Sequence, residues 1–257
     1  MRNLLNQSKV QLSIFLFLIY LLNLFANFSL QALLSVPATI LATVIADFIF
    51  IKIRKAKLFF PSAAIATGLI VGLLTDPSLP IYFPVLASIL AMFTKNFIKI
   101  GRHIFNPASF GLILASLVFG ATVSWSGVSW QILDISSLQT LLPFIILLSP
   151  GFVSLYKMRR WRIILPFLAV YFLGLSFFLK STSLYFIDPT VIFFSLVMLP
   201  EPMTTPNHPK RQILFGVSVA ALTILLSVFI FPSLNLQAFD PLIFSLLLGN
   251  LLFFRFR

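Results

Sequence analysis

The amino-acid sequence predicts an all-α integral membrane protein of about ten transmembrane helices, in two inverted five-helix repeats with both termini cytoplasmic. Apolar residues make up 60% of the chain and charged residues 9%, against roughly 45–50% and about 25% in soluble domains. A β-barrel is disfavoured because segments such as Ile14 to Leu22 are apolar on every face instead of alternating. The spacing of the basic clusters sets the number and direction of the helices.

Apolar runs bounded by prolines, polar residues and basic residues predict the individual spans. They lie near residues 11–27, 29–51, 60–75, 79–94, 107–125, 138–156, 163–179, 187–200, 212–231 and 240–254. The first span resembles a signal peptide, but no small-residue cleavage site follows it cleanly, so we predict a helix. Residues 1–257 then form a single polytopic membrane domain, with repeat one at about 1–130 and repeat two at about 131–257.

Basic clusters follow every even-numbered span, which fixes the orientation. The odd connections carry Asp76, Asp134 and Asp188 with a single base, Lys180. The clusters comprise Lys52, Arg54, Lys55 and Lys57; Lys95, Lys99 and Arg102; Lys157, Arg159, Arg160 and Arg162; Lys210 and Arg211; Arg255 and Arg257. The positive-inside rule therefore places the even connections in the cytoplasm, and we expect a multi-pass protein of the cell inner (plasma) membrane.

The two halves show a repeated pattern. An odd number of spans per half would place related halves in the membrane with opposite orientation. The third span ends at Asp76-Pro77 and the eighth at Glu201-Pro202, and both spans are short. Short, proline-bounded spans at corresponding positions predict broken helices that line a central site, unless two short spans coincide by chance.

Several kinds of chemistry are disfavoured. The chain has no Cys, which excludes an iron–sulfur cluster or a thiolate zinc site within it, and its two histidines lie in connections, which argues against haem held between helices. The net charge of +12 comes from residues at helix ends, so nucleic acid is not an expected partner. Asp47 lies shortly before Lys52, and we interpret these two as an interfacial pair with a snorkelling lysine.

Three polar, proline-rich segments stand out as candidate binding sites. They contain Thr67 and Gly68 in the third span, Asn106 before the fifth, and Glu201, Thr204, Thr205 and Arg211 after the eighth. Backbone groups freed at such breaks can bind an ion or a polar cofactor ring, and Arg211 can face a phosphate. The alternatives are a helix cap at Asn106 and an ordinary positive-inside anchor at Arg211.

At these segments the chain resembles the membrane family that contains the RnfD protein of the Rnf electron-transport complex and the NqrB protein of the sodium-pumping NADH:quinone oxidoreductase. The matching stretches are Ser62 to Leu69, Phe105 to Ala108, and Glu201 to Thr204 with Arg211 and Phe215-Gly216 downstream. The resemblance implies a ten-helix inverted repeat that carries flavin, as FMN or riboflavin. It also implies a membrane component of a redox-driven ion translocase, with other membrane subunits as partners and a quinone as a candidate acceptor.

The family also attaches FMN to a threonine on the outer side, in a motif that resembles Asp-x-x-Ser/Thr-Gly/Ser-Ala-Thr. Here the segment from Asp134 to Thr140 matches at Asp134, Ser137 and Thr140 but departs at Leu138 and Gln139. The resemblance makes Thr140 the candidate for covalent FMN. Alternatively, the hydroxyl residues in this segment cap the sixth helix.

Three functions remain open. The first is a membrane subunit of an Rnf- or Nqr-like complex, which relays electrons through bound flavin and couples them to ion translocation. The second is a non-redox transporter or channel with the same fold, in which backbone groups of broken helices form the site. A purely structural subunit with basic loops that dock partners or anionic lipid is a third reading.

Overall fold

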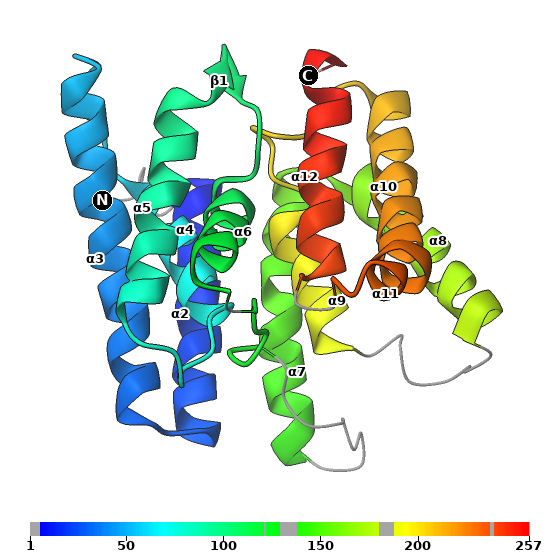
Figure 1. The fold of residues 1–257 in the computed structure, drawn as a ribbon, viewed down its shortest axis with the longest axis horizontal. Helices are drawn as coiled ribbons and strands as arrows, with labels where there is room; N and C mark the ends of the chain where they lie inside the picture. The colour runs from blue at the N-terminus through cyan, green and yellow to red at the C-terminus, as the bar shows by residue number, and fades with distance from the viewer. Residues whose placement is uncertain (1–5, 121, 129–137, 180–187, 237–238, 257) are drawn as a thin grey trace.

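The fold is built from apolar helices, most of which cross the molecule in a common direction (Figure 1). The computed structural model describes residues 6–120, 122–128, 138–179, 188–236 and 239–256. The first half contains α2 (Ser8–Ala26), α3 (Leu30–Ile53), α4 (Ser62–Leu73), α5 (Tyr82–Phe97) and α6 (Pro107–Phe119). A hairpin of two short antiparallel strands, β1 (Lys99–Ile100) and β2 (Arg102–His103), separates α5 from α6.

The second half also consists of helices, several of which are irregular. It contains α7 (Leu138–Gly151) with the π-helix η1 (Phe152–Lys157), α8 (Trp161–Leu179), and α9 (Pro189–Phe193) with the π-helix η3 (Phe194–Met198). Then follow α10 (Pro209–Ile224) with η4 (Leu225–Ile230) and α11 (Phe231–Ser233), and α12 (Pro241–Phe253) with η5 (Phe254–Phe256). Among the described residues, a helical segment therefore occupies each of the ten ranges predicted from the sequence.

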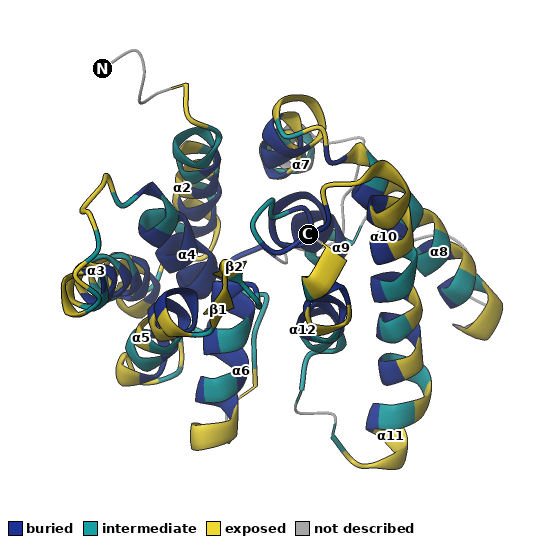
Figure 2. Ribbon diagram, turned by 90° about the horizontal axis from the view of Figure 1, so that it is seen from above, coloured by how far each residue is buried: buried dark blue, intermediate teal, exposed yellow. Residues whose placement is uncertain are grey.

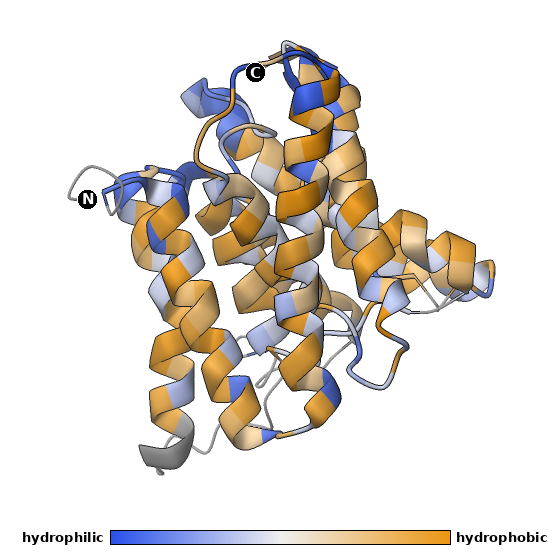
Figure 3. Ribbon diagram, turned by 90° about the vertical axis from the view of Figure 1, so that its left-hand side faces the viewer, coloured by the Kyte–Doolittle hydropathy of each residue, from blue (hydrophilic) through white to orange (hydrophobic). Residues whose placement is uncertain are grey.

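Apolar composition and length confirm a membrane protein. In the described part of the chain, four helices are long and apolar enough to cross a bilayer: Ser8–Ala26, Leu30–Ile53, Trp161–Phe178 and Pro209–Ser233. Shorter apolar helices accompany them. Large apolar side chains such as Phe25 and Phe177 point outward, and hydrophilic residues gather at the ends of the helices (Figure 3). This surface requires a hydrocarbon solvent.

One helix in each half, α6 and α12, begins with the same capping arrangement. Asn106 caps α6 because its side chain accepts a hydrogen bond from Ser109 N at 3.1 Å, and Pro107 follows it. Asp240 caps α12 through Ile243 N at 2.8 Å, and Pro241 follows it. The Asn or Asp side chain accepts a hydrogen bond from a backbone N–H that has no partner within the helix. Proline suits the next position, because the backbone N–H that it lacks would have no partner within the helix there.

The end of α6 differs from the prediction. The fifth span was expected to reach residue 125, but the helix ends at Phe119 because Gly120 adopts a left-handed conformation with φ 66°. The chain then packs against the end of α4, where Ser124 N donates to Leu74 O at 3.0 Å and Gly127 N donates to Leu73 O at 3.1 Å.

Three helix–helix contacts of the first half have counterparts in the second half. In the first half α2 packs against α4, α3 against α5, and α5 against α6; in the second, α7 packs against α9, α8 against α10, and α10 against α12. The buried faces of these helices turn toward one another within each half and toward the boundary between the halves (Figure 2). The candidate site lies at that boundary.

Candidate functional site at the boundary between the halves

The site is built on the segment that follows η3. The helix ends at Met198, and the chain turns through Pro200 and Pro202. The Thr205 hydroxyl donates to Glu201 O at 2.7 Å, and Thr204 Oγ1 lies 3.4 Å from the same oxygen. Both threonines are fully buried, so their hydroxyls hold the shape of this turn.

Asn106 connects this turn to the first half. Its amide Nδ2 donates to Glu201 Oε2 at 2.9 Å and to Met198 O at 3.3 Å, while its Oδ1 caps α6. All three polar functions of this buried side chain are thus used, which fixes its rotamer. Asn106 is therefore a helix cap, which was one of the alternatives predicted from the sequence, and it also contacts Glu201.

A second asparagine completes the junction. Asn250, fully buried in α12, accepts a hydrogen bond from Asn106 N at 2.8 Å and donates to Thr204 O at 3.3 Å. Sequence reasoning missed Asn250. Its signal was a lone amide side chain within an otherwise apolar terminal helix, because polar groups at such positions are retained where they have partners.

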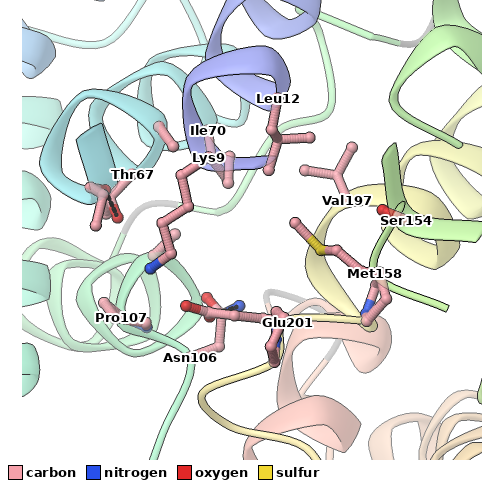
Figure 4. A pocket seen from close by; sticks show the side chains of 15 residues that line it. Lys9, Leu12, Thr67, Ile70, Asn106, Pro107, Ser154, Met158, Val197 and Glu201 are labelled. Carbon is pink, nitrogen blue, oxygen red and sulfur yellow. Dashed lines mark hydrogen bonds between the residues drawn. The ribbon is translucent and has the colours of Figure 1, made fainter. Parts of the chain in front are cut away.

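A small pocket opens beside this junction (Figure 4). It has a volume of about 50 Å³ and is lined by side chains from α2, α4, α6, η1 and η3. Lys9 reaches into it from α2, and its ammonium group points toward Pro107 and the carboxylate of Glu201. Thr67, Ser154 and Met158 line other walls. The pocket thus brings an acid, a base, an amide and hydroxyls together within apolar walls.

Comparison with known proteins identifies the family. The model of the NQR2, RnfD, RnfE family matches residues 2–254, nearly the whole chain. The chain belongs to the NQR2, RnfD, RnfE family. The resemblance based on the three polar segments is thereby confirmed, and with it the assignment to a family of membrane subunits of Rnf and Nqr complexes. A comparison with curated proteins found no match.

Two residues of α4 in the stretch that resembles the family, Thr67 and Gly68, have different roles. Thr67 lines the pocket, and its hydroxyl donates to Ala63 O at 2.8 Å. Gly68 instead faces α3, where an added Cβ would lie 2.6 Å from Thr43 Oγ1 and 2.7 Å from Ile40 Cα. Gly68 thus permits close approach of two helices and is absent from the lining of the pocket.

Two other predicted site residues lie elsewhere. Arg211 is exposed, with its guanidinium 4.8 Å from the centre of the Phe256 ring, and it does not line the pocket. Thr140 lies in the first turn of α7, but only its backbone is described. Asp134 and Ser137, the other matches to the FMN attachment motif of the family, lie outside the described residues.

Arg160 anchors the polar segment from the other side. Its Nη1 donates to Pro206 O at 2.7 Å and its Nη2 to Asn207 Oδ1 at 3.2 Å, while Gln212 Nε2 also donates to Pro206 O at 3.2 Å. Burial lowers the pKa of the Arg160 guanidinium from its ordinary value, and the nearby Arg102 lowers it further. The sequence indicated only a positive-inside cluster here, which concealed the structural role of Arg160.

The pairing predicted for Asp47 is wrong. Its carboxylate accepts hydrogen bonds from Lys95 Nζ at 2.6 Å and from Asn96 Nδ2 at 2.8 Å, both on α5. A spacing of five residues turns Lys52 roughly 140° away from Asp47 around the helix, since each residue adds roughly 100°. Lys95 approaches from the neighbouring helix on the correct side. The pair is buried, with 1% of the Asp47 side chain exposed.

Proposed function

We propose that the chain is a flavin-carrying membrane subunit of an Rnf- or Nqr-like electron-transport complex. In this role it relays electrons toward a quinone or a partner subunit and couples their transfer to ion translocation. The family match over residues 2–254 carries the proposal. The setting would be the inner (plasma) membrane, with ten helices in two inverted repeats and both termini in the cytoplasm.

The repeated contacts support the inverted arrangement. Three pairs of helices pack in the same sequential order in each half, and the Asn106-Pro107 and Asp240-Pro241 caps begin the last helix of each half. Two similar halves of five helices each must be inserted in opposite directions if every helix crosses the membrane. The central pocket then lies at the repeat interface, where many transport proteins bind their substrates.

The pocket meets only some of the needs of a flavin. Its polar groups suit the hydrogen-bonding edge of a heterocycle, and its apolar walls suit a ring. Its volume of about 50 Å³, however, is far below the roughly 300–1,000 Å³ typical of pockets for ligands of that size. The pocket in this conformation does not fit a flavin ring. Thr140 remains the candidate for covalent FMN.

Bound flavin in pocket variants tests this proposal. The protein is purified in mild detergent, and flavin absorbance is recorded for the wild type, Asn106→Leu and the control Ser29→Ala. Ser29 caps α3 through Ala32 N at 3.0 Å and does not line the pocket. We expect flavin in the wild type and in Ser29→Ala, and reduced flavin in Asn106→Leu if the pocket contributes. Equal flavin in all three proteins would exclude the pocket, and flavin in none would overturn the redox function.

The size of the pocket favours a second candidate function, a non-redox transporter or channel. A volume of about 50 Å³ admits a few water molecules or a small solute. Glu201 and Thr67 supply oxygen atoms around it. Uptake of small cations into liposomes that contain the purified, flavin-free protein, lost in Glu201→Gln, would support this function over the first.

A further inference from the structure

A groove between α2, α3 and α4 lies outside the site described above. We propose that it binds one acyl chain of an anionic phospholipid, whose phosphate rests against Lys55 and Lys57. The proposal depends on the membrane location and not on flavin. We call this groove the α2–α4 groove, and its walls include Ile14, Phe17, Ile40, Phe60, Ile65 and Leu69.

The surface of the α2–α4 groove matches hydrocarbon. The groove has a volume of about 260 Å³, and no polar surface lines it. The Ser13 hydroxyl, on its edge, is occupied because it donates to Lys9 O at 2.9 Å. The groove exposes no polar surface to a ring ligand such as a quinone head group, whereas an acyl chain needs none.

The length of the groove along α4 is comparable to the thickness of the hydrocarbon layer of one leaflet. Along α4 its walls run from Ser62 to Leu69, which corresponds to roughly 10 Å at about 1.5 Å per residue. Half of the hydrocarbon core of a bilayer is roughly 15 Å thick. A transmembrane partner helix would pack along most of the full core thickness of roughly 30 Å. The groove is therefore long enough for an acyl chain from one side of the membrane and too short for a transmembrane helix.

The connection that leads to the groove at Phe60 is basic and amphipathic. Lys55 and Lys57 lie in the connection from α3 to α4, and both are exposed. Leu58, Phe59 and Phe60 follow them directly, with 53%, 63% and 49% of their surfaces exposed. Cations beside exposed apolar side chains are typical of segments at the boundary between head groups and acyl chains.

The charge of this connection selects an anionic head group. The connection contains no acid, and Arg54 is occupied because its Nη1 donates to Asn96 Oδ1 at 2.7 Å. Lys55 and Lys57 are thus the exposed cations nearest in sequence to Phe60, which lines the groove. A phosphatidylglycerol molecule can bury one chain in the groove while its phosphate contacts these lysines.

The test measures lipid bound to the full chain by native mass spectrometry. The purified protein is titrated with phosphatidylglycerol and, separately, with phosphatidylcholine of the same acyl chains. One variant removes the cations (Lys55→Gln with Lys57→Gln), and Lys99→Gln with Lys210→Gln is its control. A second variant fills the groove (Ile14→Trp), and Leu21→Trp is its control. Ile14 and Leu21 share a helix and are 45% and 44% exposed, but only Ile14 lines the groove.

We expect phosphatidylglycerol to bind more tightly than phosphatidylcholine in the wild type and in both controls. The lysine variant should weaken its binding about tenfold or more, since each lysine near an anionic surface contributes favourably. Ile14→Trp should abolish tight binding of both lipids. Equal affinity for the two lipids, or variants that match their controls, would overturn the proposal, as would a co-purified quinone or peptide that disappears in Ile14→Trp.

Discussion

At the scale of single residues, the junction between the halves depends on Asn106, whose polar side-chain atoms all form hydrogen bonds. Asn106 caps α6, contacts Glu201 and donates to Met198 O, and its backbone N–H donates to Asn250. Satisfied polar groups of this kind fix one packing arrangement, because loss of one partner leaves the others buried without a bond.

Asn106→Ala should therefore lower the stability by more than the loss of a cap. A cap is worth about 1 kcal/mol, and loss of the hydrogen bonds to Glu201 and Met198 O costs about 1–3 kcal/mol more. The thermal midpoint in detergent should fall clearly further for Asn106→Ala than for Ser29→Ala, which removes a cap alone. Equal losses in the two variants would mean that the contacts with Glu201 and Met198 contribute nothing.

The buried ion pair of Asp47 and Lys95 gives a second prediction. Lys95→Met should destabilise the protein by about 3–5 kcal/mol, because it leaves the Asp47 carboxylate buried without its cation. Asp47→Asn combined with Lys95→Met should be less harmful than Lys95→Met alone, since no buried charge remains. Denaturation midpoints of Lys95→Met, Asp47→Asn and the double variant provide the measurement, and additive effects would contradict a coupled pair.

At the scale of helices, close packing requires small residues at defined positions. Gly68 lies against the backbone of α3, where a methyl group would meet Ile40 Cα at 2.7 Å. Gly151 is the matched case in α7, because its nearest neighbours are the Cδ atoms of the Leu196 side chain at 3.2 Å. A side chain can shift, whereas two packed helix backbones cannot accommodate an added group without separating.

Gly68→Ala should accordingly destabilise the protein by about 1–3 kcal/mol through overpacking. Gly151→Ala should be neutral, or stabilising by about 0.5 kcal/mol, because alanine favours helix. Thermal unfolding of the two purified variants measures the difference. A stable Gly68→Ala variant that has lost a bound ligand would instead assign Gly68 to a binding site.

The helices themselves could be predicted from the sequence, since long apolar runs and basic clusters carry a strong local signal. The end of α6 could not, because Gly120 in a left-handed conformation is one residue within a continuing apolar pattern. Contacts between distant segments were also hidden. Asn106 and Glu201 were both predicted as site residues, yet only the packing of the halves shows that they touch. Asp47 was assigned to Lys52 because its partner Lys95 lies on another helix.

At the scale of the whole molecule, the orientation of the chain is open to direct measurement. The chain has no cysteine, so single cysteines report their own side without background. Ser78→Cys, in the exposed connection after α4, should react with an impermeant maleimide in intact cells. Lys55→Cys and Lys210→Cys should react only after permeabilisation, because basic connections are retained inside. The reverse pattern would invert the topology.

The flavin content of the purified protein shows whether the chain is a redox subunit. The chain is co-expressed with a flavin transferase, purified and denatured, and flavin is measured both in the released fraction and as fluorescence of the protein band, beside Thr140→Ala. We expect stoichiometric flavin in the wild type. Fluorescence of the band that is lost in Thr140→Ala would assign covalent FMN to Thr140, and release on denaturation would assign a non-covalent site. Absence of flavin from both fractions would contradict the proposed redox function.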